Sequence, residues 1–287
     1  MTVYCLKYGV LKKHLTRIAD IPLSACWVEG SYAQSDRFIS DLNPEDELFI
    51  FSSKRALTFN RSGLKCKVSI MIAEPEIIQK QFYHLISFFQ RRFYRIATHS
   101  DNILAKCKNA EKWTHGGRWI EFDTPQLFEK TGMVSIIASK QRSSEGHLLR
   151  HELISWAQQK GVVLDLFGKG YNWLEKKSNG HAPYRFSVII ENSRSSGYFT
   201  EKLIDCLLCE SVPIYWGDPK IADHFDLRGF LICDDLKDLQ RALENLDTRL
   251  FEELHPYLVK NKKRALTLFD QPNSMTQLAG PKIFDFT

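Results

Sequence analysis

The sequence predicts an α/β protein built from two domains, each with a parallel β-sheet. Apolar runs of strand length alternate with longer amphipathic segments, which is the pattern of βα units. The alternation is interrupted once, around Pro125 and Gly132, and then restarts. A chain of 287 residues is also long for one domain and comfortable for two. We expect domains at residues 1–128 and 129–287, two Rossmann-like units facing a central cleft that collects small charged ligands.

The first domain is expected to contain four strands and one crossover helix. Each strand is an apolar run bounded by polar or turn residues. The segment Glu76–Arg92 lies between two of these runs and predicts the crossover helix. A shorter run, Arg118–Phe122, is expected to close this half. The expected strands are Ala25–Val28, Glu47–Phe51, Lys67–Ile72 and Tyr94–Thr98.

The second domain repeats the alternation of strand-length and helix-length segments. Its tail, Arg249–Phe269, predicts a long amphipathic helix, and the sequence leaves open whether that helix packs back on the first domain. The expected strands are Met133–Ala138, Val162–Phe167, Phe186–Ile190, Val212–Trp216 and Phe230–Cys233. The other expected helices are Gly146–Gln159, Thr200–Cys209 and Leu236–Leu246.

Bulk composition is that of an ordinary globular protein. Hydrophobic residues make up 44% and charged residues 25% of the chain. The net charge of +5 suits phosphates, acidic glycans or an anionic membrane surface, although a value this small also falls within ordinary scatter. No RRM, KH or zinc-finger pattern is present, so nucleic acid is not an expected partner.

Cysteine usage and the N-terminus indicate a cytoplasmic location, with contact at the inner face of a membrane left open. Seven cysteines are too sparse and irregular for a disulfide framework. Cys206 and Cys209 form one C-x-x-C, but it lies in an apolar helical segment, which favours buried thiols over a redox or metal site. The chain begins without a signal-peptide pattern and has no run of about 18 apolar residues.

The stretch between the strand Phe186–Ile190 and the next helix concentrates polar chemistry. Ligands of open α/β sheets bind at the carboxyl ends of strands. Thr200 can cap the helix, whose N-terminus attracts a phosphate, and Lys202 adds a positive charge. The alternative is a capped surface helix with a solvated lysine. The polar residues of this loop and helix start are Asn192, Tyr198, Glu201 and Lys202.

Other strand ends of the second domain supply further candidates. Arg150 lies on the helix that follows the strand Met133–Ala138 and can hold a diphosphate bidentately, although a surface arginine is the ordinary interpretation. The turn Gly168-Lys169-Gly170 lacks the third glycine of a dinucleotide fingerprint, so it is a plain turn or a neighbour of the nucleotide. Trp216 ends a buried strand and lines either a base or the core.

A catalytic carboxylate is expected from the first domain. Glu74 follows the apolar strand Lys67–Ile72 and could act as a general base, or it could be a solvated carboxylate near a helix start. Glu29 is a second, weaker candidate. No Asp-x-Asp occurs anywhere in the chain, so the sequence offers no such pair to hold a divalent ion on a diphosphate. Cationic side chains and helix dipoles would have to stabilise a departing phosphate.

Taken together, these motifs resemble glycosyltransferase family 10, the α-1,3/4-fucosyltransferases, over roughly residues 133–246. Three segments carry the resemblance: the run from Tyr184-Arg185-Phe186 to Glu191-Asn192-Ser193, then Gly197-Tyr198-Phe199-Thr200-Glu201-Lys202, then Val212-Pro213-Ile214-Tyr215-Trp216-Gly217. The resemblance implies a GT-B enzyme with GDP-fucose in its C-terminal domain and the acceptor in its N-terminal domain. It also implies inversion at the anomeric centre without an essential metal or other cofactor.

The resemblance implies a role for each candidate residue. Asn192 and Tyr198 would lie near the diphosphate or fucose, Glu201 would contact the donor sugars, and Arg150 and Lys202 the diphosphate. Glu74 would be the base, although Pro75 follows it where bacterial relatives carry a polar residue. Further residues of the donor pocket would be Gly168, Lys169, Tyr184, Arg185 and Trp216.

Departures from the animal members favour a bacterial-type protein. The chain has neither their N-terminal membrane anchor nor their paired cysteines. The acceptor is expected to be a bacterial surface polysaccharide or lipopolysaccharide, on this context alone. Two alternatives stay open: the same fold with another nucleotide-sugar donor, and a non-catalytic protein that binds nucleotide-sugars or glycans. The sequence does not indicate the oligomeric state.

Overall fold

The computed structural model describes residues 1–13, 17–28, 31–33, 35–113, 117–120 and 128–270. The chain forms two compact units, one taking in Met1–Gly117 and the other Arg118–Leu268. Each unit is described by itself below. The boundary expected near residue 128 stays a prediction, since residues 121–127 lie outside the described part.

Unit 1 is built on a seven-stranded sheet of order β3-β2-β1-β4-β5-β6-β7. The strands β1, β4, β5, β6 and β7 are parallel, while β2 runs antiparallel to both β1 and β3. Every parallel strand therefore ends at the same edge of the sheet. The strands are β1 (Val3–Leu6), β2 (Cys26–Val28), β3 (Ser31–Tyr32), β4 (Glu47–Phe51), β5 (Lys67–Ile72), β6 (Ile96–Thr98) and β7 (Ala110–Lys112).

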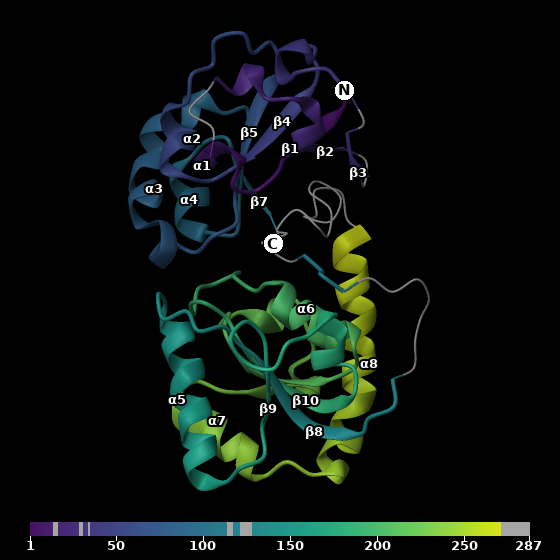
Figure 1. The fold of residues 1–287 in the computed structure, drawn as a ribbon. Helices are drawn as coiled ribbons and strands as arrows, with labels where there is room; N and C mark the ends of the chain where they lie inside the picture. Colours follow the sequence, from purple (N-terminus) through teal and green to yellow (C-terminus); the bar gives the residue numbers. More distant parts are fainter. Residues whose placement is uncertain (14–16, 29–30, 34, 114–116, 121–127, 271–287) are drawn as a thin grey trace. The chain divides into compact units, whose positions relative to one another are not determined.

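Helices pack on this sheet through one continuous apolar core. The central strands are fully buried, as expected of strands covered on both faces. Their side chains on one face meet Phe82, Tyr83 and Ile86 of the longest helix. Figure 1 shows α2, α3 and α4 together on one side of the sheet. The helices are α1 (Val10–Lys13), α2 (Lys54–Thr58), α3 (Glu76–Phe89) and α4 (Asp101–Lys106).

Unit 2 is built on a five-stranded sheet of order β12-β11-β10-β8-β9, parallel throughout. All five strands end at one edge, and each polar loop that follows begins there. The strands are β8 (Gly132–Ile137), β9 (Asp165–Phe167), β10 (Tyr184–Ile190), β11 (Val212–Trp216) and β12 (Leu231–Ile232). The helices are α5 (Glu145–Lys160), α6 (Glu201–Leu208), α7 (Leu236–Glu244) and α8 (Thr248–Asp270).

The expected elements agree with the structure wherever an apolar run is long. Strands β4, β5 and β11 have the predicted bounds. Strands β1, β3 and β7 were not predicted, since they have only four, two and three residues. The run Arg118–Phe122, expected to close the first half, is irregular over its described part, residues 118–120, and Arg118 begins unit 2 instead. Two main-chain N–H groups there donate to a carboxylate instead of a neighbouring strand.

Candidate functional site

A buried carboxylate joins the end of β10 to the start of α6. Glu191, the residue after β10, is fully buried. Its Oε1 accepts the main-chain N–H of Thr200 at 2.8 Å, and its Oε2 accepts the Thr200 hydroxyl at 2.7 Å. Thr200 caps α6 by accepting the N–H of Lys202, as predicted from the sequence. Residues 192–199 are thus held at both ends by the bonds between Glu191 and Thr200. Part of the α6 N-terminus is already hydrogen-bonded within the chain, so not all of its N–H groups are available to a ligand.

Lys202 lies between two carboxylates in the first turn of α6. Its ammonium is 3.3 Å from Glu201 and 3.8 Å from Glu191, and it donates to the Thr200 hydroxyl at 3.1 Å. Glu201 has a second cation, Lys177, at 3.8 Å. About a quarter of the Lys202 side chain is exposed. The ammonium is therefore held in place while solvent still reaches it, which suits a group that meets an anionic ligand.

Arg150, on α5, fastens the opposite side of the same loop. Its Nε donates to the carbonyl of Ile190 at 3.0 Å, and its Nη2 donates to the same carbonyl and to the Asn192 side-chain oxygen. The guanidinium is almost completely buried. Arg150 and Asn192, which are 42 residues apart in sequence, are brought together here. Contact of Arg150 with a diphosphate stays a prediction, because the observed hydrogen bonds of its guanidinium go to the Ile190 carbonyl and the Asn192 side chain.

Two glycines allow these elements to approach. A Cβ on Gly146, in the first turn of α5, would lie 1.7 Å from the carbonyl oxygen of Glu191. A Cβ on Gly217, directly after β11, would lie 2.4 Å from the Tyr215 hydroxyl and 2.8 Å from the Glu191 side chain. No other residue type fits at either position without moving the backbone or the buried ring. The sequence analysis missed Gly146 and Glu191, whose only signal is that they flank the polar loops at strand ends.

The remaining candidates of unit 2 divide between the two edges of its sheet. The Gly168 turn follows β9 and packs on the carbonyl of Ala138, beyond the end of β8, with Lys169 exposed. Trp216 ends β11, is buried, and donates its indole N–H to the carbonyl of Asp234 at 3.1 Å. These residues lie at the edge where Glu191 and Lys202 lie. Tyr198 is also buried, with 2% exposed, so little of its phenol faces a ligand.

Tyr184 and Arg185 lie at the other edge. They are the first two residues of β10, whose far end reaches Asn192. The Tyr184 hydroxyl donates to Asp165, at the start of β9, and its ring packs on Gly132, at the start of β8. A seven-residue strand is about 20 Å long, so these side chains are separated from the polar loop by the length of the sheet. We therefore leave Tyr184 and Arg185 out of the proposed donor site.

Burial and the local cations shape the protonation of this cluster. Burial raises the pKa of Glu191, while Lys202 and the Thr200 hydrogen bonds oppose that rise. His147, next to Gly146, has its pKa lowered to about 4 by burial and by the charges of Arg150 and Lys202. His147 is therefore neutral at pH 7, and the positive charge at this edge comes from arginine and lysine.

Asp205, one turn further along α6, anchors the segment that enters unit 2. Its Oδ1 accepts the main-chain N–H groups of Trp119 at 2.9 Å and Ile120 at 3.3 Å. The ammonium of Lys177 lies over the Trp119 ring at 3.3 Å and also pairs with Glu201. Burial raises the pKa of Asp205 to about 7, against the lowering effect of Lys177 and the two N–H groups. The cluster around Lys202 and this anchor therefore share Lys177.

In unit 1, Glu74 lies just beyond the end of β5 and is held by two tyrosines. The Tyr8 hydroxyl donates to Glu74 Oε1 at 3.2 Å, and the Tyr83 hydroxyl donates to the Glu74 carbonyl at 2.9 Å. Burial and the nearby Glu74 raise the pKa of Tyr8, so its phenol stays protonated and can donate. The carboxylate is half-buried. Tyr8 was not predicted as a site residue, and Glu29, the alternative base, lies outside the described residues.

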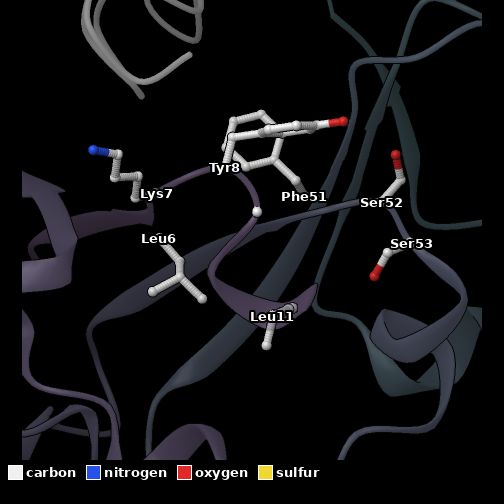
Figure 2. A pocket seen from close by; sticks show the side chains of 8 residues that line it. Leu6, Lys7, Tyr8, Leu11, Phe51, Ser52 and Ser53 are labelled. Atoms are coloured by element: carbon white, nitrogen blue, oxygen red, sulfur yellow. The ribbon is translucent and has the colours of Figure 1, made fainter. Parts of the chain in front are cut away.

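A small hollow opens beside Tyr8, between the ends of β1 and β4 (Figure 2). Its empty volume is about 260 Å³, part of it open to solvent. The Tyr8 and Phe51 rings lie together on one side, in an edge-to-face pair with centroids 5.3 Å apart. The buried Ser52 hydroxyl has no hydrogen-bond partner among the described residues. The lining residues are Leu6, Lys7, Tyr8, Gly9, Leu11, Phe51, Ser52 and Ser53.

Within the described ranges, no group of three or more His, Cys, Asp or Glu side chains is arranged to hold a metal ion. The same residues include no helix that is both long and apolar enough to span a membrane.

The two α/β units define the class of the protein. The fold is similar to that of an alpha1,3-fucosyltransferase solved with GDP-fucose, with a TM-score of 0.50 and 14% identity, covering 79% of this chain and 72% of that one. It is also similar to S. aureus TarM, with a TM-score of 0.54 and 10% identity, covering 85% of this chain and 54% of that one. The fold is GT-B, as predicted.

The family follows from the sequence of unit 2. Residues 127–259 match the family model described as glycosyltransferase family 10 (fucosyltransferase), C-terminal domain. Over 75 residues the chain is 36% identical to an alpha-(1,3)-fucosyltransferase of Helicobacter pylori, and over 82 residues it is 34% identical to a putative fucosyltransferase of Acanthamoeba polyphaga mimivirus. The predicted resemblance is confirmed over residues 127–259, which match the C-terminal domain of family 10 glycosyltransferases.

The aligned stretches cover only part of each protein. They span 26% and 28% of this chain, and 16% and 13% of the bacterial and viral relatives. The solved fucosyltransferase has a low identity to this chain, so that likeness concerns the fold alone.

Proposed function

We propose that this protein transfers L-fucose from GDP-fucose to a hydroxyl of a glycan acceptor, with inversion of the anomeric centre. The observation that carries the proposal is the cluster at the end of β10, where Arg150, Asn192, Glu191, Thr200 and Lys202 meet. That cluster lies within residues 127–259, the range that matches a fucosyltransferase domain. A second support is the fold similarity to an enzyme solved with GDP-fucose.

The proposed reaction makes one bond and breaks one bond. The acceptor oxygen attacks the anomeric carbon from the face opposite the nucleotide, while the bond from that carbon to the diphosphate oxygen breaks. The acceptor proton passes to the Glu74 carboxylate, and GDP leaves with the electron pair of the broken bond. The acceptor oxygen becomes the new glycosidic oxygen.

The cations of unit 2 would stabilise the negative charge that develops on the departing GDP. Lys202 is pre-positioned by Thr200, Glu191 and Glu201, so it needs little reorganisation when the charge forms. Arg150 would orient Asn192 and the loop backbone from behind. Without an Asp-x-Asp pair, we propose that these side chains replace a metal ion on the diphosphate.

The acceptor would be bound by unit 1, at the edge of the sheet that carries Glu74. The hollow beside Tyr8 offers an aromatic surface, which suits the apolar face of a sugar ring. A bacterial surface polysaccharide or lipopolysaccharide is the proposed acceptor class. We propose a cytoplasmic enzyme that works at the inner face of the membrane.

Two alternative functions can be separated from this one. TarM shares the fold and is solved with UDP, so a similar fold does not select the nucleotide or the sugar. The second alternative is a protein that binds donor without transferring it, which the set of Glu74, Arg150 and Lys202 argues against because binding alone needs no base.

The test is incubation with GDP-fucose and an array of glycan acceptors, read by mass spectrometry. The expected result is a fucosylated acceptor, and a parallel thermal-shift panel of GDP- and UDP-sugars should show the largest shift with GDP-fucose. A larger shift with another nucleotide-sugar would mean that this other nucleotide-sugar, and not GDP-fucose, is the donor. Donor binding without product on any acceptor, and without donor hydrolysis, would favour the non-catalytic alternative.

A further inference from the structure

Helix α3 exposes an apolar stripe on the side that faces away from the sheet. Its inner side buries Phe82, Tyr83 and Ile86 in the core of unit 1. Its outer side carries Ile77, Ile78, Leu85 and Phe88, which are 55%, 39%, 43% and 81% exposed. Single exposed apolar residues are normal, but four on one helix, two before and two after the kink at Gln79, are not. We call these four residues the α3 stripe.

Positive side chains surround the α3 stripe. Lys80 of the same helix and Arg91, just beyond its end at Phe89, are exposed. The neighbouring helix α2 begins with Lys54 and Arg55, and α4 ends at Lys106, all of them exposed. These three helices lie on one side of the sheet in Figure 1.

Acidic residues do little to cancel this charge. Glu76, the first residue of α3, is half-buried rather than exposed. Asp101, the first residue of α4, is paired with Lys112 at 3.3 Å. The side of unit 1 that carries the α3 stripe is therefore positively charged around an apolar centre.

This combination selects among partners. A helix with an apolar face and basic flanks is the pattern of segments that lie in the interface of a bilayer. Anionic headgroups would meet the lysines and arginines, while Phe88 and Leu85 would enter the acyl boundary. A two-fold contact with a second copy would set the cations of the two copies against each other. A nucleic acid would use the charges but leave the apolar side chains exposed to water.

We propose that the α3 stripe and its basic rim dock unit 1 onto an anionic phospholipid surface. This surface goes beyond the transfer reaction and can be tested without donor or acceptor. Membrane contact of this kind would bring the sheet edge that carries Glu74 to acceptors that are themselves held at a lipid surface.

The test is co-sedimentation of the full chain with vesicles of phosphatidylcholine alone or with roughly a third phosphatidylglycerol. Binding is expected only to the anionic vesicles, and it should weaken as salt is raised, since exposed charges are screened. Leu85→Asp with Phe88→Asp should lower the vesicle partition at least about tenfold, because it removes two apolar anchors and adds two negative charges. Replacing Lys80 and Arg91 by serine should lower it roughly fivefold per charge while leaving the stripe intact.

The matched control is Val163→Asp, which changes an equally exposed apolar residue of unit 2, 75% exposed, into the same acid. It should bind vesicles like the unaltered chain. The proposal is overturned if the unaltered chain does not sediment with anionic vesicles, or if both the aspartate and the serine variants bind as it does. A dimer in light scattering that the aspartate variant dissociates, without vesicle binding, would assign the stripe to a second copy. Should the aspartate variant not fold, the serine variant decides alone.

Discussion

The carboxyl edges of the two sheets are built in different ways. In unit 2 the edge after β10 gathers Glu191, Thr200 and Lys202, which lie within twelve residues of one another in sequence. In unit 1 the edge after β5 depends on Tyr8 and Glu74, which are 66 residues apart. The first cluster is bonded on every side and mostly buried, whereas the second is a half-buried carboxylate beside an open hollow.

This difference reflects what each edge has to do in the proposed reaction. A diphosphate has the same charge in every donor of its class, so a fixed cluster of charges can serve it. Acceptors differ in shape from one glycan to another. The unit that binds them therefore needs an open binding surface, on which only the base has to be held in a fixed position.

Glu74→Gln tests whether unit 1 supplies the base. The amide cannot accept the acceptor proton, so kcat should fall roughly 10²- to 10⁴-fold, while GDP binding to unit 2 stays unchanged. Steady-state kinetics and a GDP titration measure the two effects. Glu76→Gln, two residues along the chain, is the control and should leave kcat within about twofold. A loss of only a few-fold for Glu74→Gln would place the base elsewhere.

Lys202→Ala tests the fixed cluster of unit 2. It removes a charge-assisted contact, so the dissociation constant for GDP should rise roughly 10- to 100-fold. Calorimetric titration with GDP measures it. Lys237→Ala is the matched control, since Lys237 is also the second residue of a helix at this edge and is exposed. Near-wild-type GDP binding and turnover in Lys202→Ala would remove Lys202 from the donor site.

Tyr8→Phe separates positioning of the carboxylate from packing of the ring. The phenyl ring keeps its edge-to-face contact with Phe51, while the hydrogen bond to Glu74 is lost. We expect kcat to fall about 2- to 10-fold with the donor KM unchanged. Tyr83→Phe loses a bond to the Glu74 carbonyl rather than to its carboxylate, so it should change kcat less. A fall in thermal stability that equals the fall in kcat would assign Tyr8 a structural role only.

Asp205→Asn tests the anchor of unit 2 through its pH dependence. The folded-state pKa of Asp205, about 7, lies above the usual unfolded value near 3.9. The folded state therefore binds more protons between about pH 4 and pH 7, so the stabilisation present below pH 4 is lost as pH rises through that window. The asparagine variant should show a flatter fall of Tm with pH over the same window in thermal melts. An unchanged slope would mean that Asp205 is ionised throughout.

The fold and the donor edge could be predicted because their signals are local. Strands β4, β5 and β11 are uninterrupted apolar runs, and the loop from Asn192 to Lys202 carries its polar residues in one stretch. The parallel sheet then forces strand ends to one edge, so strand order alone brings Gly168 and Trp216 near Asn192. Tyr184 and Arg185 belong to the same conspicuous run, but position along β10 puts them at the far edge.

What could not be predicted depends on long-range packing. Nothing near Tyr8 in sequence indicates that its hydroxyl reaches Glu74, because β1 is short and had not been recognised. Gly146 is an unremarkable helix residue until the carbonyl of Glu191 is seen where its Cβ would lie. Arg150 was predicted to hold a ligand, and the structure shows its guanidinium bonded to the end of β10. Such roles follow from three-dimensional contacts that neither periodicity nor propensity encodes.

The anchor at Asp205 also limits which substitutions the connection into unit 2 can accept. Asp205 holds main-chain N–H groups of Trp119 and Ile120, and every amino acid except proline has that group. The hydrogen bonds would therefore survive a change of side chain at either position, and the sequence there is free to drift as far as packing allows. A proline at either position removes one of them and leaves part of a buried carboxylate without its donor. At these two positions proline would thus be rejected for a reason that lies in the backbone, whereas other changes would be limited by the packing of the Trp119 ring under Lys177 and by the burial of Ile120.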